Sequence, residues 1–494
     1  MHISKLTYGF RWGIALMIAM GLWWLVAAQP VWACGGGVIC VDVDATGAAT
    51  GLSWTDAYTN VTAALDWTNV HTDTTYEIWV AEGVYYPYIG PDPTYDARYE
   101  TFYIRYDNVR LYGGFAATET LRTQRDWVAH PTILSGDIDT NDTNTDGNFI
   151  AETWNDQQGE NAYHVLVVTP PIDGSITGNT VVDGFIITAG YADAGSGHRP
   201  YSLGSGLYCG DSNCSPTLNN ILFSGNWASE CGGGMFNQGW GGASNPVLTN
   251  ITFRGNRADG GGGMCNISTS SGSESSPVLT NIIFSGNWGS SGGAMFNESY
   301  EGSESNPILT NVLFSGNQGY SGGAMCNTSS EGKSYPVLTN ATFSGNLANS
   351  YGGAIYNGSY GNGASNLTLI NSISWGNTAP NAPQFYSGVG ATITVSYSDV
   401  EWPSGIYTGT GNLNVDPQFV APIAASSAPT TTGDYHLQTS SQAINTGNNP
   451  SVTVSTDLDG APRIFGGKVD MGAYEFSFEP DVFIYLPVII RTSS

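Results

Sequence analysis

The residues best placed for metal chemistry lie in one acidic stretch, GDIDTNDTNTDGN, at residues 136–148. A calcium-binding loop begins with oxygen donors at alternate positions and then a Gly at the sharp turn. Asp142, Asn144 and Asp146 fit that beginning, whereas the twelfth position, which needs a Glu, is Thr153. The stretch therefore predicts a structural calcium ion, and a plain turn rich in Asp and Asn is the alternative.

Closely spaced carboxylates are the candidates for acid–base catalysis. A glycosidase uses two carboxylates about 5–10 Å apart. Asp137 with Asp139, or Asp457 with Asp459, have a suitable spacing in the sequence. Asp137 and Asp139 are also spare oxygen ligands for the predicted calcium site. Any acidic loop supplies such pairs, so their spacing alone does not predict an enzyme.

Aromatic side chains offer a second kind of site, because their rings can stack on sugars. Trp240, Tyr300 and Tyr360 occur in corresponding variable segments of a repeating region. These residues predict a polysaccharide-binding edge, and packing of the loops against the rest of the protein is the alternative. A second outward row is expected at one further repeat position, which holds Phe236, Cys265, Phe296, Cys326 and Tyr356.

The elements that must position these residues are repeats. Between residues 216 and 377 an aromatic residue recurs every 29 to 32 residues and is followed closely by Asn. A fixed period of this length indicates stacked structural units. The recurring aromatic residues are Phe223, Phe253, Phe284, Phe314, Phe343 and Trp375.

The pattern within one repeat, NPVLTNITFRGN at residues 245–256, predicts a coil with corners. Side chains at even and odd positions of a strand point to opposite faces. Leu248 and Asn250 occupy even positions, whereas Ile251 and Phe253 occupy odd ones. The inward face cannot continue through Asn250, so a corner is expected there, where Asn tolerates left-handed backbone angles. Three strands and three corners per repeat describe a parallel β-helix with about 30 residues per coil. The Asn residues would stack as three amide ladders and the aromatic residues as an inward spine.

The other segments are organised around these repeats. The basic start and apolar run of residues 1–33 predict a secretory signal peptide. A short amphipathic helix over Thr55–Asp66 is expected to cap the open end of the stack. The expected segments are an N-terminal cap with the first strands at 34–105, irregular coils with the acidic loop at 106–215, regular coils at 216–377, final coils at 378–476 and an apolar tail, a possible cell anchor, at 477–494.

The charge limits the possible partners. The chain has 14 Lys or Arg against 41 Asp or Glu, which gives a net charge of -27. Nucleic-acid binding needs basic patches, so no nucleic-acid partner is expected. The acidity suits solubility outside a cell or cation binding.

The seven cysteines fit an exported protein, in which disulfides are stable. Cys265 and Cys326 hold the same repeat position two coils apart, too far for a bond to each other, and are expected to be packed thiols. Export permits disulfides between the closely spaced Cys34 and Cys40 and between Cys209 and Cys214, and lipid attachment at Cys34 is an alternative.

Several motifs resemble known proteins. The GGAM and FSGN pairing is similar to the repeats of polymorphic outer membrane proteins. VDVDATG, LYGGF with TQRDW, NVDPQF, DLDGAPR and VDMGAYE resemble secreted bacterial right-handed β-helix proteins with a choice-of-anchor C-terminal region. The resemblance implies an all-β, right-handed parallel β-helix of the pectate-lyase kind, export, and attachment to the cell envelope by the C-terminus. It implies no settled activity.

Catalytic clusters are scarce in the regular repeats. Asp259 is the only Asp in residues 216–377, and Arg254, Arg257 and Lys333 are the only basic residues there. Arg254 is expected to be a solvated surface charge, because its neighbour in the sequence points inward. We predict an exported, extracellular or cell-surface protein without enzymatic activity that adheres to an extracellular polysaccharide or cell-surface ligand. The alternatives are a carbohydrate-active enzyme (a polysaccharide lyase or glycoside hydrolase) and a structural surface-layer component.

Overall fold

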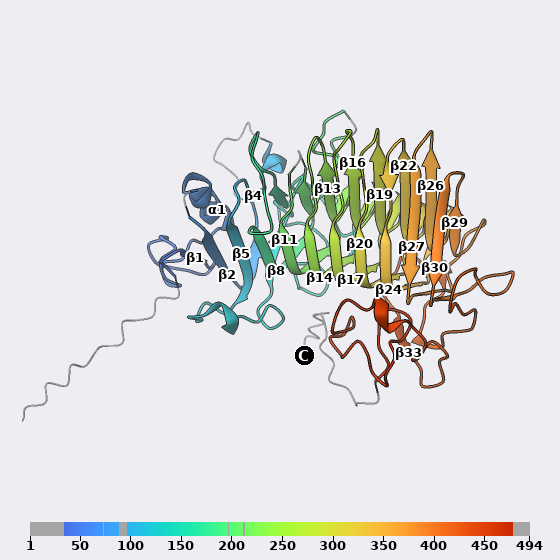
Figure 1. The fold of residues 1–494 in the computed structure, drawn as a ribbon. Coiled ribbons are helices and arrows are strands. Elements are labelled where there is room, and N and C mark those ends of the chain that lie inside the picture. Colours follow the sequence, from blue (N-terminus) through green and yellow to red (C-terminus); the bar gives the residue numbers. More distant parts are fainter. Residues whose placement is uncertain (1–33, 73, 88–95, 196, 211–212, 478–494) are drawn as a thin grey trace, which may run out of the picture.

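The computed structural model describes residues 34–72, 74–87, 96–195, 197–210 and 213–477, so the predicted signal peptide and nearly all of the apolar tail lie outside it. The chain winds into a stack of coils whose strands pair in parallel with those of the coils before and after. Figure 1 shows the stack as a rod that runs from the blue N-terminal coils to the orange ones. The predicted parallel β-helix is confirmed.

Three parallel sheets run along the rod. The sixteen-stranded sheet contains β1 (Val38–Val41), β2 (Tyr76–Ala81), β3 (Gly83–Tyr85), β5 (Val109–Phe115), β6 (Thr132–Ser135), β8 (Val181–Thr188), β11 (Thr217–Ser224), β14 (Val247–Arg254), β17 (Val278–Ser285), β20 (Ile308–Ser315), β23 (Lys333–Ser334), β24 (Val337–Ser344), β27 (Ala364–Ile370), β28 (Ile373–Trp375), β30 (Ala391–Ser396) and β31 (Asp399–Val400). The nine-stranded sheet contains β4 (Phe102–Ile104), β7 (Leu166–Val168), β10 (Leu207–Cys209), β13 (Met235–Gly239), β16 (Met264–Ser268), β19 (Met295–Tyr300), β22 (Met325–Ser330), β26 (Ile355–Tyr360) and β29 (Phe385–Ser387). The six-stranded sheet contains β9 (Tyr191–Ala192), β12 (Trp227–Ala228), β15 (Arg257–Gly260), β18 (Trp288–Ser291), β21 (Gln318–Ser321) and β25 (Leu347–Tyr351).

The predicted corner lies inside each regular strand of the sixteen-stranded sheet. Asn250 has a φ of 55°, in the left-handed region that Asn tolerates. This turn lets Leu248, Ile251 and Phe253 all point inward and become fully buried, although their sequence parities differ. The same backbone conformation recurs at Asn220, Asn281, Asn311, Asn340 and Asn371.

The corner side chains form the first predicted amide ladder. The Nδ2 of Asn250 donates to the Oδ1 of Asn220 at 3.0 Å, and equivalent bonds continue from coil to coil as far as Asn340. Asn371 leaves the ladder and donates to the carbonyl of Asn448 instead. Each satisfied hydrogen bond contributes about 0.5–1.5 kcal/mol, whereas an unpaired buried amide would cost more.

Two further ladders follow the other corners. The second runs without a break from Asn226 to Asn377, and its buried amides bond both to the next Asn and to a backbone carbonyl. The third runs from Asn237 to Asn327. The predicted continuation to Asn357 is not formed: the Oδ1 of Asn357 accepts from the hydroxyl of Ser365, and the Nδ2 of Asn327 finds no partner among the described residues.

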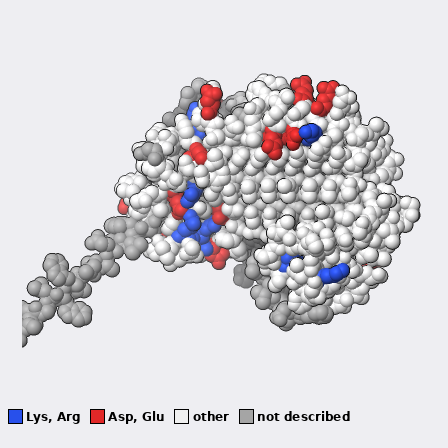
Figure 2. Space-filling model, viewed as in Figure 1, with Lys and Arg blue, Asp and Glu red and all other residues white. Residues whose placement is uncertain are grey.

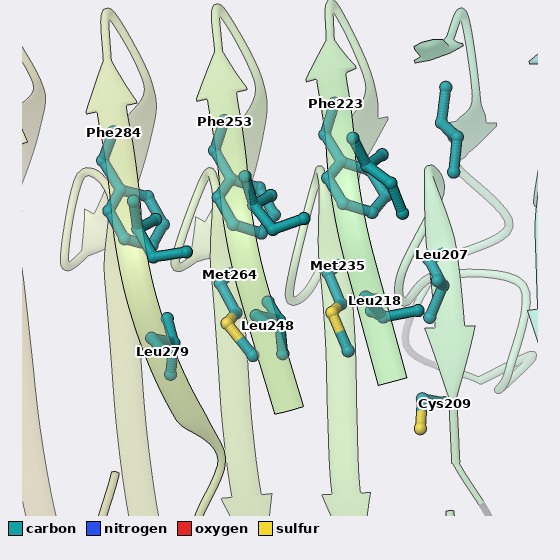
Figure 3. Close-up of a cluster of buried hydrophobic side chains, with 14 of the residues drawn as sticks. Leu207, Cys209, Leu218, Phe223, Met235, Leu248, Phe253, Met264, Leu279 and Phe284 are labelled. Atoms are coloured by element: carbon teal, nitrogen blue, oxygen red, sulfur yellow. The ribbon is translucent and has the colours of Figure 1, made fainter. Parts of the chain in front are cut away.

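The inward spine consists of Phe side chains. Rings from Phe223 to Phe343 stack with centroids 4.6–4.9 Å apart and nearly parallel planes. Figure 3 shows three of these rings above the Met and Leu side chains of the same core. Trp375 does not join them, and this prediction is wrong. Ser374 pairs with Phe343 in register, so strand alternation turns Trp375 to the opposite face.

The N-terminal helix, α1 (Val61–Val70), begins later than predicted because Asn60 caps it by accepting a bond from the backbone N–H of Thr62 at 2.6 Å. Its buried residues belong to the core, and it contacts β1, β2 and β4. Its role as a cap stays a prediction. No helix of the described residues is both long and apolar enough to cross a membrane. The short 3₁₀ turns are η1 (Ala97–Tyr99), η2 (Arg122–Gln124), η3 (Ala425–Ser427) and η4 (Asn449–Ser451).

Coils do not continue to residue 476, as was predicted for residues 378–476. The last strand of the stack is β31, to which Leu413 adds one parallel bridge, and β32 (Phe419–Ala421) and β33 (Asp434–Leu437) then pair with each other, antiparallel. Figure 1 shows this red segment lying beneath the rod. Trp402 and Tyr407 at its start pack against the core of the rod, whereas its later apolar residues pack on outward-facing side chains such as Leu313 and Ile373, which explains the difference. We call residues 401–476 the docked segment.

The two predicted disulfides between closely spaced cysteines are formed. Cys265 is not a thiol, which corrects the prediction. It is bonded to Cys231 of the preceding coil, with a Cα–Cα distance of 5.8 Å. The two cysteines occupy different positions of the repeat, and stacking of the coils brings them together. Comparing cysteines at the same repeat position therefore could not predict this bond. Cys326 is a buried free thiol, as predicted.

Candidate functional site

The acidic stretch forms part of a long loop between β6 and β7, and its side chains bond to that loop. Asp142 accepts one bond from a backbone N–H at 2.6 Å and another from the amide of Asn161 at 2.9 Å. Asp146 accepts from the amide of Asn148 at 2.9 Å, and Asn144 accepts from a different backbone N–H. The three predicted calcium ligands are therefore engaged with different parts of the loop.

Three carboxylates of this loop influence one another. Asp137 accepts a bond from the backbone N–H of Asp142, and Asp139 accepts one from that of Glu160. Burial raises the pKa of Asp142 to about 7, and the charges of Asp137 and Asp139 add to the increase. Within the described ranges, no group of three or more His, Cys, Asp or Glu is arranged to hold a metal ion. Calcium binding by this loop stays a prediction.

The second carboxylate pair lies in the docked segment. Asp457 is buried and accepts bonds from two amides of its own turn and from the backbone N–H of Glu475. Asp459 bonds to His436 at 2.5 Å. The buried guanidinium of Arg463 donates to three backbone carbonyls of the same segment. The DLDGAPR and VDMGAYE motifs thus form a network that holds the segment together.

Arg254 is not a solvated charge, and that prediction is wrong. Its side chain is 16% exposed and lies 3.8 Å from Glu152. The long loop covers it, because the backbone N–H of Trp154 donates to the carbonyl of Gly255 at 3.1 Å. Burial lowers the pKa of Arg254. The strand that contains Arg254 was predicted from the sequence, but the loop that covers the side chain was not.

The predicted aromatic residues share one row on the outer face of the nine-stranded sheet. Tyr300 pairs in register with Ser330, and Ser330 pairs with Tyr360. Trp240 follows Gly239, the last paired residue of β13. The three aromatic residues thus stand on alternate coils, which are about 9–10 Å apart. We call Trp240, Tyr300 and Tyr360 the aromatic row.

Two members of the aromatic row are open to solvent. The exposed fraction is 61% for Trp240 and 55% for Tyr360. Tyr300 is half-buried beside Glu298, and burial together with that carboxylate raises its pKa. Burial also raises the pKa of Glu298, to which the hydroxyl of Thr328 donates at 3.4 Å. The row therefore presents aromatic rings with polar groups between them.

The second outward row behaves differently along its length. Phe236 and Phe296 are buried in a cluster with Leu203 and Cys231, so packing against neighbouring segments, the alternative reading, holds for them. Tyr356 is only half-buried at the other end of the row.

A group of four tyrosines extends the exposed surface at the C-terminal end. Tyr356 and Tyr360 are linked through their hydroxyls at 3.1 Å. The ring of Tyr386 stacks on Tyr356 at 5.1 Å between centroids and lies 4.6 Å from Tyr351. Sequence reasoning missed Tyr351 and Tyr386. Tyr386 could have been found from the sequence, because Phe385 and Tyr386 of β29 occupy the same repeat positions as Ile355 and Tyr356 of β26.

Carboxylates are scarce within the strands of this surface. Glu298 is the only carboxylate among the residues of β13, β16, β19, β22 and β26. A glycosidase needs a second carboxylate at close range. The arrangement can bind rings by stacking and hydroxyl groups by hydrogen bonds, and it supplies no paired acid and base from those strands.

Comparisons with known proteins support the repeat more than any activity. Residues 340–358 match the Chlamydia polymorphic membrane protein (Chlamydia_PMP) repeat. These residues run from a corner Asn through Phe343 to Tyr356 and Asn357. The predicted similarity to that repeat is therefore confirmed over part of one coil. The choice-of-anchor resemblance gains no support and stays a prediction.

Curated proteins give no match to this sequence. Among solved structures, the chain is similar to the crystal structure of pectate lyase Pel9A, with 14% sequence identity and a TM-score of 0.40. The similarity covers 89% of this chain and 96% of that one.

Proposed function

We propose that this protein is exported, remains at the cell surface or is secreted, and binds a neutral polysaccharide along the outer face of the nine-stranded sheet. The observation that carries the proposal is the aromatic row, in which the strongly exposed rings of Trp240 and Tyr360 lie four coils apart and the half-buried ring of Tyr300 lies midway between them. An extended polysaccharide presents ring faces at regular intervals. The separation of about 9–10 Å between alternate coils suits a disaccharide step along such a chain.

Charge favours a neutral ligand at this surface. Glu301 and Glu331 lie at the exposed turns next to the aromatic row, and Glu298 lies within the sheet face. Figure 2 shows acidic side chains along this loop-rich edge of the rod. Because like charges repel, an acidic polysaccharide would be disfavoured here. The polymorphic membrane protein repeat supports a location at the cell surface.

The test is binding of the mature chain to an array of neutral β-glucans, mannans and chitin oligomers and of uronate-containing glycans. We expect binding to a neutral group and a loss of affinity of at least about tenfold in Trp240→Ala or Tyr360→Ala, since a buried ring contact is worth about 1.4 kcal/mol or more. Tyr320→Ala is the matched control, because Tyr320 is 60% exposed on the six-stranded sheet. Equal losses in all three variants would contradict the proposal.

A further inference from the structure

A cleft with a volume of about 440 Å³ opens on the outer face of the sixteen-stranded sheet. Its floor is one row of that sheet, in which Tyr112, Asp183 and Asn219 pair in register on β5, β8 and β11. Its wall comes from residues 116–131, which include Trp127. The cleft thus lies on a different sheet from the aromatic row.

The wall is fixed closely against the floor. Residue 114 must be Gly, because a Cβ at this position would lie only 2.6 Å from the Cα of Trp127. Arg125 lies between two rings, 5.1 Å from the centroid of Tyr112 and 5.0 Å from that of Trp127. It also pairs with Asp183 at 2.7 Å. Arg125 therefore holds the wall in place, and the LYGGF and TQRDW motifs build the cleft together.

Two other guanidinium groups keep donors available. Arg122 uses Nη1 to contact Glu77 at 2.5 Å and the hydroxyl of Tyr112 at 3.1 Å. Its side chain is 41% exposed, and no bond from its Nε or Nη2 is formed within the described part of the chain. Arg110 borders the cleft, because it pairs in register with Val181 of the lining. Its Nε donates to the carbonyl of Asn179 at 3.5 Å, and it takes part in no ion pair with another described residue. Figure 2 shows basic side chains gathered near the N-terminal end of a largely uncharged sheet face.

We propose that this cleft binds a carboxylate-bearing sugar. A guanidinium fork matches a carboxylate better than any other protein group. The lining holds two Arg and one Asp, which gives the site one net positive charge in a chain of net charge -27. The half-buried ring of Trp127 offers an apolar face, and Asn219 and Thr123 offer partners for hydroxyl groups.

The same residues disfavour a phosphate. Asp183 contributes a carboxylate to the lining, which accepts bonds from sugar hydroxyls but repels a dianion. The volume also lies in the range of small-ligand sites, about 300–1,000 Å³. A single sugar acid, or the acidic end of a longer chain, therefore fits the cleft better than inorganic phosphate.

Calorimetric titration of the mature chain with glucuronate, N-acetylneuraminate, glucose and inorganic phosphate tests this inference. We expect heat with at least one of the two sugar acids and none with glucose. Arg122→Gln should weaken that binding at least about tenfold, since one charge-assisted bond is lost. Arg110→Gln should weaken it as well, and it leaves the contacts of the wall intact. Arg199→Gln, on an exposed ion pair elsewhere, is the matched control.

Binding of phosphate as tight as that of the sugar acids, or equal affinities in Arg122→Gln and Arg199→Gln, would overturn the inference. The absence of heat with both sugar acids would overturn it too. Variants of Trp240 and Tyr360 should leave sugar-acid binding unchanged. The cleft and the aromatic row can therefore fail or succeed independently.

Discussion

A recurring Asn is the residue that turns this sequence into a coil. Asn250 and its equivalents adopt left-handed backbone angles at the corner and join their amides from coil to coil. Both features follow from the chemistry of Asn and from the slip in side-chain parity, so they could be predicted from the sequence. The Phe spine was predictable for the same reason.

Residues whose surroundings come from distant segments could not be predicted in this way. Arg254 lies next to an inward Phe in the sequence, yet Glu152 and its loop bury it. Trp375 follows the spacing of the repeat, but a shift of one residue in register turns it outward. For Arg254 the deciding contact is far away in the chain, whereas the outward turn of Trp375 could have been predicted, because Trp375 lies four residues after Asn371 while each spine Phe lies three after its own corner Asn.

His436 is the residue whose protonation should affect stability. It lies 2.6 Å from Asp434 and 2.5 Å from Asp459, and its ring packs on Tyr474. Although burial opposes the charge, the bonds to Asp459 and Asp434 raise its pKa to about 9. Because the pKa of His436 is higher in the folded protein than in the unfolded chain, its protonation stabilises the fold. The stabilisation is complete below the unfolded-state pKa of about 6.5 and is lost as the pH rises through about 9.

Raising the pH from 6.5 to 9.5 should lower the Tm of the wild type by about 1–2 °C more than it lowers the Tm of His436→Gln. The difference between the two proteins isolates His436 from other groups that titrate in this range. His198→Gln, at an exposed loop position, serves as the control. A wild type and a His436→Gln variant with parallel pH profiles would disprove the role of the imidazolium.

At the scale of elements, neighbouring coils are joined covalently as well as by hydrogen bonds. The Cys231–Cys265 disulfide connects the turn before β13 to β16 and closes a loop with a sequence separation of 34. Cys231→Ser with Cys265→Ser should lower the free energy of unfolding by about 2–4 kcal/mol, because the unfolded chain gains freedom. Denaturant unfolding of the oxidised wild type and the double variant measures this.

The single variant Cys326→Ser is the comparison for that experiment, since Cys326 is buried but unpaired. It should cost less than the double variant. If the double variant unfolds at the same denaturant concentration as the wild type, the disulfide does not contribute to stability.

The docked segment is the element that the sequence indicated least well. Its short strands and turns look like further coils, because both structures use the same kinds of residues. The structure shows instead that Asn311 donates to the carbonyl of Thr456 at 2.7 Å and that Thr342 accepts from Ala473 at 2.9 Å. These partners lie more than a hundred residues apart, so only the folded rod brings them together.

At the scale of the whole molecule, the rod presents two surfaces of different chemistry. The aromatic row on the nine-stranded sheet is bordered by acidic turns, whereas the cleft on the sixteen-stranded sheet gathers guanidinium groups. Sequence reasoning found the members of the aromatic row, because strand alternation and the repeat period fix their positions. It did not find the cleft, because register and loop packing bring its lining together from four separate segments.

The most direct test of neutral-polysaccharide binding is the affinity of cello- and chito-oligosaccharides of increasing length for the wild type and for Trp240→Ala. For the series that binds, affinity should rise each time the chain becomes long enough to reach another ring of the aromatic row, at intervals of about 9–10 Å. Trp240→Ala should lose the last of these increases and keep the others. An affinity that does not depend on length, or a variant that behaves as the wild type does at every length, would contradict the account.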